Sequence, residues 1–212
     1  MTTLVLEDRQ GYADLVTYVG RARALDKSGA IRLQADGTVL TAYVGVLAGH
    51  GLMGDGAVVG LRVTRLAEPV SVDATVSLAS VTDRFARPQD HVGVWRLPVP
   101  PTTVQAGWAA LAPPRSGWER VGAVPGSELR AAAKAGIAEI ATGTTGSDGG
   151  PAVAALRDRV WGRLTDTSPP VPAGGAFAAY TLGFLTGEPD CLVAAHGRWT
   201  RLSTPAGHVL VR

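Results

Sequence analysis

The sequence has a single cysteine, no long apolar run and almost no excess of charge of either sign. The lone Cys191 excludes a disulfide within the chain, which agrees with a reducing cytosol. No apolar stretch approaches the roughly 20 residues that are needed to cross a bilayer. Glu7 and Asp8 stand where a secretory signal would have a basic start. We therefore expect a cytoplasmic protein that does not associate with membranes.

The charge balance is close to neutral, with 20 basic residues against 18 acidic ones. An excess of two charges is too small to indicate a nucleic-acid partner, so we do not expect nucleic-acid binding. Arginine far outnumbers lysine, and only Lys27 and Lys134 are lysines. Together with abundant Ala, Gly, Val and Pro, this bias is typical of a GC-rich, actinobacterium-like genome. The composition thus indicates a source and not a ligand.

The residue types that carry catalysis do not form a recognisable set. Cys191 and His196 are five residues apart on an expected strand, so they should point to opposite faces. Ser147 lies in TGSDG, which misses the G-x-S-x-G pattern of a serine nucleophile. The four histidines lack the paired spacing of zinc ligands; they are His50, His91, His196 and His208. We expect no catalytic residues, no metal and no cofactor.

Two stretches at opposite ends of the chain follow one plan. Residues 30–47 (AIRLQADGTVLTAYVGVL) and 190–204 (DCLVAAHGRWTRLST) each have an apolar run, a small residue, a polar residue and Gly, then a second run. Each follows a segment with helical spacing. This predicts an α+β fold, in which antiparallel sheets pack with helices in two pseudo-related helix-plus-hairpin halves. Only the glycines of the two turns align, with Asp36 opposite His196, so a true duplication is left open.

The expected N-terminal half, residues 1–97, starts with a helix that Asp8 caps. A hairpin then turns at Asp36-Gly37, a pair that tolerates positive φ at both positions. Strands over residues 58–66 and 70–72 lead to a short helix with Leu78, Val81 and Phe85 on one side. A strand over residues 92–99 lies at a sheet edge because of Pro98.

The expected C-terminal half, residues 98–212, is rich in helices and then forms a β-meander. A helix carries Val104, Trp108 and Leu111, and two further helices lie near residues 129–140 and 153–164. Residues 173–185 are apolar all round and should be buried. A hairpin and a last strand over residues 207–212 end the chain. The two halves are either separate or form one compact domain.

Two glycine-rich loops invite a ligand-binding interpretation. GTTGSDGG, residues 143–150, follows a helix and lacks the Lys of a phosphate loop, so a helix-to-helix connection is favoured. GHGLMGDG, residues 49–56, places His50 and Asp55 among glycines that allow a ligand close to the backbone. A plain connection between strands is the commoner explanation of such a loop.

The segment PPRSGWE, residues 113–119, is the most distinctive motif. A stiff proline pair followed by Arg115 and Trp118 sets a planar cation near an aromatic face, beside Glu119. Such a site could hold a carboxylate, a phosphate or a side chain of a partner. The alternative is a loop that Trp118 pins in the core and that Arg115 fixes by a salt bridge.

Four stretches carry a resemblance to a family. They are GRARALDKSGAIRLQADG, PPRSGWERVG, AFAAYTLGFL and GRWTRLSTPAGHVLVR. On these stretches the chain resembles an uncharacterised actinobacterial protein family of unknown function. The resemblance spans nearly the whole chain, and it implies no activity and no functional residue.

Two functions remain open at this point. The first is a non-enzymatic module that binds a protein partner or self-associates, as a homodimer or other homo-oligomer, because the chain ends in a strand, HVLVR, whose edge could pair with another copy. The second is a small-molecule-binding protein or enzyme whose pocket gathers His50, Asp55, Arg115 and Glu119.

Overall fold

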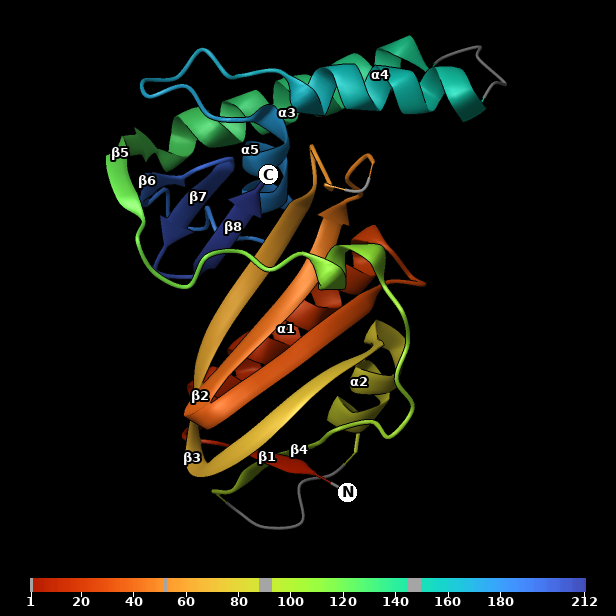
Figure 1. Cartoon of the computed structure of the whole chain (residues 1–212), viewed down its shortest axis with the longest axis vertical. Coiled ribbons are helices and arrows are strands. Elements are labelled where there is room, and N and C mark those ends of the chain that lie inside the picture. Colours follow the sequence, from red (N-terminus) through yellow and green to blue (C-terminus); the bar gives the residue numbers. More distant parts are fainter. Residues whose placement is uncertain (1, 52, 88–92, 145–149) are drawn as a thin grey trace. The chain divides into compact units, whose positions relative to one another are not determined.

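The computed structural model describes residues 2–51, 53–87, 93–144 and 150–212 (Figure 1). The chain divides into two compact units. Unit 1 comprises Met1–Val46 and Leu61–Leu111, and unit 2 comprises Leu47–Gly60 and Ala112–Arg212. The division does not follow sequence order. Residues 58–60 of the long strand Val58–Ser77 belong to unit 2, and the rest of that strand belongs to unit 1. The boundary expected after residue 97 stays a prediction.

Unit 1 combines an antiparallel sheet with two helices and one short 3-10 turn. Its strands pair in the order β4-β1-β3, and β2 also pairs with β3. The elements are β1 (Thr3–Leu6), α1 (Arg9–Leu25), β2 (Ala30–Leu47), β3 (Val58–Ser77), α2 (Leu78–Phe85), β4 (Trp95–Pro98) and η1 (Gly107–Ala110). The α+β class expected from the sequence is confirmed.

Helix α1 begins where the sequence places its cap. The Asp8 carboxylate accepts a hydrogen bond of 2.7 Å from the Gly11 backbone N–H, which would otherwise lack a partner in the first turn. The buried side chains recur at spacings of three and four, and the Tyr18 hydroxyl donates to the carbonyl of Ala42 in β2 at 3.3 Å. The core of unit 1 therefore lies between α1 and the sheet.

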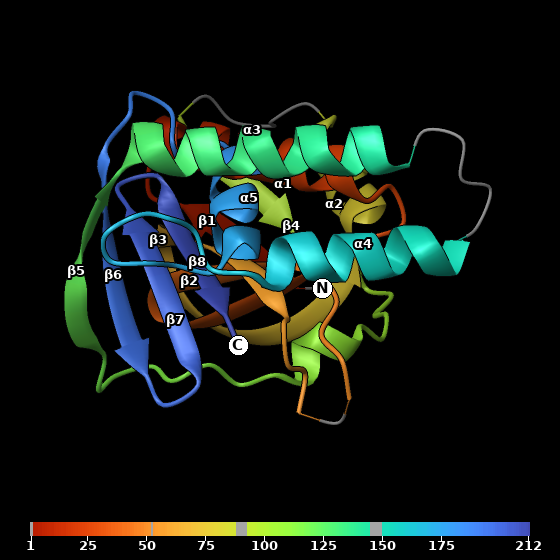
Figure 2. The same cartoon turned by 90° about the horizontal axis from the view of Figure 1, so that it is seen from above.

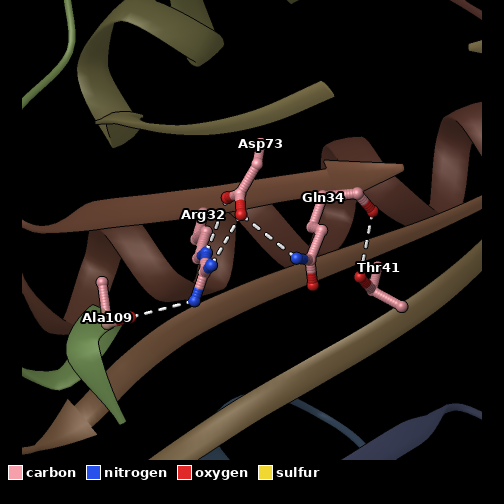
Figure 3. A network of polar contacts seen from close by, with 5 residues as sticks. All are labelled: Arg32, Gln34, Thr41, Asp73 and Ala109. Carbon is pink, nitrogen blue, oxygen red and sulfur yellow. Dashed lines mark hydrogen bonds and ion pairs between the residues drawn. The ribbon is translucent and has the colours of Figure 1, made fainter. Parts of the chain in front are cut away.

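Only one residue of the Asp36-Gly37 pair in the first hairpin adopts the positive φ that was expected to suit both. Gly37 has a φ of 68°, but Asp36 does not adopt positive φ. Strand β2 runs through the turn, and the Thr41 hydroxyl donates to the Gln34 carbonyl across it at 2.9 Å (Figure 3). A single left-handed glycine is enough to reverse the chain here.

Unit 2 places helices on one face of a second antiparallel sheet (Figure 2). The first residues of β3 pair with β8, and the order continues through β7 and β6 to β5. The elements are β5 (Glu119–Pro125), α3 (Gly126–Gly143), α4 (Gly150–Gly162), α5 (Ala173–Thr181), β6 (Asp190–His196), β7 (Trp199–Thr204) and β8 (Gly207–Val211). Helix α5 is buried, as its composition predicts. None of the described helices is both long and apolar enough to cross a membrane.

The expected helix around Val104 and Trp108 is wrong. Val104 instead donates its backbone N–H to the Thr75 carbonyl at 2.9 Å, and only the short η1 follows. The Trp108 ring lies so close to Gly45 that a Cβ there would be 2.4 Å from the ring. Arg32 holds the same segment, since it donates to the Ala109 carbonyl at 2.9 Å while its other nitrogens bind Asp73 (Figure 3). These contacts within unit 1 outweigh the local helical pattern.

The expectation that the last strand is a sheet edge is also wrong. Strand β8 pairs with β7, and on its other side the chain continues the ladder, because Arg212 N–H donates to the Ala57 carbonyl at 3.0 Å. The Gly56 N–H donates in return to the Arg212 carbonyl at 2.8 Å. In the described part of the chain, the outermost strands of the path are β4 and β5. The expected edge strand over residues 92–99 is found as β4, although Val92 lies outside the described residues.

Candidate functional site

The glycine-rich loop at residues 49–56 is a tight connection whose two polar side chains point to different partners. His50 and Asp55 exchange backbone hydrogen bonds of 2.8 and 3.1 Å. His50 Nε2 lies 3.2 Å from Asp158 Oδ1, and Asp55 Oδ1 lies 3.5 Å from Arg198 Nη1. Both side chains are exposed, so these pairs contribute little to stability. Leu52 lies outside the described residues.

The PPRSGWE segment is fixed by Trp118. The Trp118 indole N–H donates to the Pro114 carbonyl at 2.9 Å. Gly117 has a φ of 75°, and a Cβ there would lie 3.1 Å from His196, so only glycine fits this turn well. No carboxylate among the described residues forms an ion pair with Arg115. Of the two anchors that the sequence suggests, Trp118 therefore holds the loop and Arg115 does not.

A cation does lie over the Trp118 ring, but it comes from β7. The Arg201 guanidinium carbon is 4.6 Å from the ring centroid, within the range of a cation–π interaction. His196 approaches the same ring with its edge, at a centroid distance of 6.0 Å. The sequence suggests Arg115 as a cation beside Trp118, whereas the structure places Arg201 over this ring, 83 positions after Trp118 in the chain.

The strand register brings a second arginine into the same row. Ala194 of β6 pairs with Arg120 of β5 on one side and with Arg201 of β7 on the other. Directly opposed residues point to the same face of a sheet, so the two arginines flank the small Ala194. The opposite face packs on α5, where Leu202 and Val211 contact Gly175. The arginines thus belong to the face that α5 does not cover.

A third arginine stacks on another tryptophan of this face. The Arg212 guanidinium carbon lies 5.5 Å from the Trp199 ring centroid, and Trp199 is 6% exposed beneath it. Trp199 pairs with His196 across the β6–β7 hairpin. We call this surface the arginine–tryptophan face, which is defined by Trp118, Arg120, His196, Trp199, Arg201 and Arg212.

The arginines of this face lack acidic partners. No carboxylate of another residue in the described ranges lies within ion-pair distance of Arg120, Arg201 or Arg212, whereas Arg130 and Arg163 of the same unit pair with Glu188 and Glu139. Burial lowers the pKa of Arg201, and its buried Nε has no hydrogen-bond partner. A carboxylate that reaches the other nitrogens of this guanidinium would accept strong charge-assisted hydrogen bonds.

Cys191 does not form a nucleophile–base pair with His196. Cys191 is fully buried, and this burial raises the pKa of its thiol to about 11. It pairs with Val124 on the face opposite His196, as the odd spacing predicts. Among the described residues no group of three His, Cys, Asp or Glu side chains could hold a metal ion. His91 and most of the GTTGSDGG loop lie outside the described residues.

A shallow hollow of about 220 Å³ lies in unit 1, between the start of α1 and residues 62–65 of β3. Two of its polar side chains already have partners. The Asp8 carboxylate caps α1, and Arg62 forms an ion pair with Asp14.

The structure separates most of the residues singled out from the sequence. Trp118 joins the arginine–tryptophan face, and Glu119 begins β5 opposite Ala195. No hydrogen bond or ion pair among the described residues joins either His50 or Asp55 to Arg115 or Glu119. Sequence reasoning missed Arg120 and Arg201. Each arginine lies two positions after a tryptophan, and residues two positions apart in extended chain point to the same face, so this spacing was the signal.

Two family models match the chain. The domain of unknown function (DUF8010) matches residues 1–108, and the domain of unknown function (DUF8185) matches residues 113–212. This agrees with the resemblance to a family of unknown function, while the actinobacterial source stays a prediction. No curated protein matches the chain.

The fold is similar to that of bacterial sliding clamps. The beta sliding clamp of Caulobacter crescentus, crystallised with PEG bound to a proposed beta-motif tethering region, is 14% identical with a TM-score of 0.52. A DNA polymerase sliding clamp from the same organism is 12% identical with a TM-score of 0.51. Each match covers 100% of this chain but only 65% of the clamp chain. At these identities the likeness shows the fold alone.

Proposed function

The chain belongs to the family of the domain of unknown function DUF8010, and from its structure we propose that it is a non-enzymatic cytoplasmic module that binds a partner protein on the arginine–tryptophan face of unit 2. The observation that carries this proposal is the stack of Arg201 on Trp118, in which a partly buried guanidinium has no carboxylate partner. Such a group is incompletely satisfied in the free protein and becomes satisfied when an acceptor arrives.

The composition of the face supports a protein partner. Arginine and tryptophan are among the residues most enriched at the energetic centres of protein interfaces, because they bury a large area and also form hydrogen bonds. The rigid strands β5, β6 and β7 hold Trp118, Arg120 and Arg201 in fixed relative positions. A rigid surface loses little conformational freedom on binding.

The fold likeness supports the same proposal. The Caulobacter crescentus clamp structure has PEG bound to a proposed beta-motif tethering region, and we take a region of this kind on a similar fold as support for a binding function. The single thiol of this chain is buried and protonated. Ser203 Oγ lies 2.9 Å from His208 Nδ1 across β7 and β8, and we propose that this pair joins the two strands and does not act in catalysis. Binding therefore accounts for the geometry better than catalysis.

A random-peptide display selection against the immobilised full chain tests the proposal. We expect selected peptides whose affinity falls at least about tenfold in Arg201→Gln and in Trp118→Leu. Arg157→Gln is the matched control, because Arg157 is an exposed arginine of α4 in the same unit. A selection without binders, or binders that both face variants retain fully, would contradict the proposal.

Self-association through the sheet edges is a second candidate, favoured by the outermost strands β4 and β5. Both edges carry features that oppose pairing. Strand β4 is four residues long and ends at Pro98, and β5 has a bulge between Arg120 and Gly122. Light scattering at high protein concentration decides the matter, since a strict monomer excludes a homo-oligomer of this kind.

A further inference from the structure

We propose that the segment held by the arginine–tryptophan face is an extended acidic peptide that also carries one large apolar side chain; this inference rests on the proposed function. The charges of the face, the spacing of its arginines and a large apolar side chain exposed on it support a partner of this chemistry.

The charge of the face is complementary to carboxylates. Arg120, Arg201 and Arg212 have no ion pair with another described residue, and the planar fork of a guanidinium matches a carboxylate with two parallel hydrogen bonds. The acidic group that the register places on this face is Asp190, at the far end of β6. It lies four residues from Ala194, about 13 Å along the strand. The arginines therefore remain free for carboxylates of a partner.

The spacing of the arginines suits an extended chain. Arg120 and Arg201 lie on strands β5 and β7 with β6 between them, so their backbones are about 10 Å apart. In an extended peptide, side chains two positions apart point the same way at a separation of about 7 Å. Two acidic residues at that spacing reach both guanidinium groups when the long arginine side chains lean inward.

The apolar part of the peptide has a place beside these charges. Leu192 is 46% exposed, and it lies two positions before Ala194 on the same face of β6. Burial of such a side chain against an apolar residue of a partner removes both from water, which favours binding. The charges then fix the direction of the peptide, and the apolar contact adds affinity.

A single-stranded nucleic acid fits the face less well. Its bases would need an open aromatic ring to stack on, and Arg201 already occupies one side of the Trp118 ring. The chain as a whole carries a formal net charge of only +2. Local carboxylate recognition is thus favoured over attraction to a phosphate backbone.

Fluorescence anisotropy with the full chain tests the inference. The probes are a short fluorescein-labelled peptide with Asp residues at alternate positions around one Leu, the same peptide with Asn for every Asp, and a labelled oligothymidylate. We expect the acidic peptide to bind at least about tenfold more tightly than the Asn peptide, with an affinity that falls as salt rises. Arg120→Gln is expected to weaken binding by about tenfold or more, whereas Arg157→Gln leaves it unchanged.

The outcomes separate this inference from the proposed function. Arg120 is exposed, so its substitution leaves the fold intact even if Arg201→Gln does not. Equal binding of the Asp and Asn peptides, or tighter binding of the oligothymidylate, overturns the acidic-peptide inference. If the selected peptides lack acidic residues but their affinity still falls in Trp118→Leu and Arg201→Gln, the acidic-peptide inference is wrong and the proposed binding face is supported. If no peptide depends on the face, both fail.

Discussion

Trp118 and Arg201 come from either side of strand β6, and the guanidinium carbon of Arg201 lies 4.6 Å from the centre of the Trp118 ring. Trp118 is in turn tied to the Pro114 carbonyl, so the loop before β5 and the middle of β7 are joined through one aromatic ring. The stack fixes the position of the arginine on which the proposed binding depends.

This stack should contribute a measurable coupling energy. In a double-mutant cycle with Trp118→Leu and Arg201→Gln, we expect a coupling of about 0.5–1 kcal/mol in the free energy of unfolding, the value typical of a partly exposed cation–π pair. Chemical denaturation of the two single variants and the double variant measures it. Strictly additive effects would show that the two side chains are neighbours without an energetic link.

Two helical glycines should respond oppositely to alanine. A Cβ at Gly20 of α1 meets nothing within 4 Å, so Gly20→Ala should stabilise the protein by about 0.5–1 kcal/mol through helix propensity. A Cβ at Gly136 of α3 would lie 2.4 Å from the Trp161 ring, which stacks on Phe177 at 4.4 Å. Gly136→Ala should therefore destabilise by about 1–3 kcal/mol. Thermal denaturation of both variants compares them directly, and a stabilised Gly136→Ala would contradict the packing described for α3 and α4.

Arg32 should protect the segment that carries Trp108. The side-chain hydrogen bond with Asp73 raises the pKa of Arg32, so the guanidinium stays charged while it also donates to the Ala109 carbonyl (Figure 3). We expect Arg32→Ala to speed chymotrypsin cleavage after Trp108 severalfold, because local opening becomes easier. Arg65→Ala, an exposed arginine of β3, is the control. Unchanged cleavage in Arg32→Ala would show that Trp108 and the Val104–Thr75 hydrogen bond hold the segment without Arg32.

The buried thiol should make stability fall at alkaline pH. Burial raises the pKa of Cys191 to about 11 from an ordinary value near 9, so the unfolded chain loses this proton at a lower pH than the folded one. The resulting stability is present in full below pH 9 and is lost as the pH rises towards 11, up to about 3 kcal/mol. Urea denaturation of the wild type and of Cys191→Ala between these pH values measures it. A parallel fall in both proteins would assign the loss to other groups.

The local signals in the sequence predict much of the fold. The Asp8 cap, the helical spacing of α1 and α3, the buried α5 and the two hairpins all follow from patterns within a few residues. The failures have long-range causes. Residues 104–111 look helical, but the Thr75 carbonyl and the space over Gly45 hold them in another conformation. Strand β8 ends the chain but gains a second neighbour from residues near Ala57, which no local pattern indicates.

The members of the candidate site could not be predicted from the sequence. The PPRSGWE motif suggests Arg115 as a planar cation beside Trp118, and the cation that the structure places over this ring comes from another strand. Its arginine is Arg201, because the register of β5, β6 and β7 decides which side chains share a face. Single-sequence patterns do not fix the register between strands that are far apart in the chain.

Photo-crosslinking tests the binding face most directly. Benzoylphenylalanine in place of Leu192 stands on the arginine–tryptophan side of β6, and in place of Leu164, which is 60% exposed, it serves as the matched control. With a peptide from the display selection, we predict an adduct at position 192 that disappears in the Arg201→Gln background, and none at position 164. Crosslinking at position 164 alone, or at 192 regardless of Arg201, would contradict the claim that this face binds the partner.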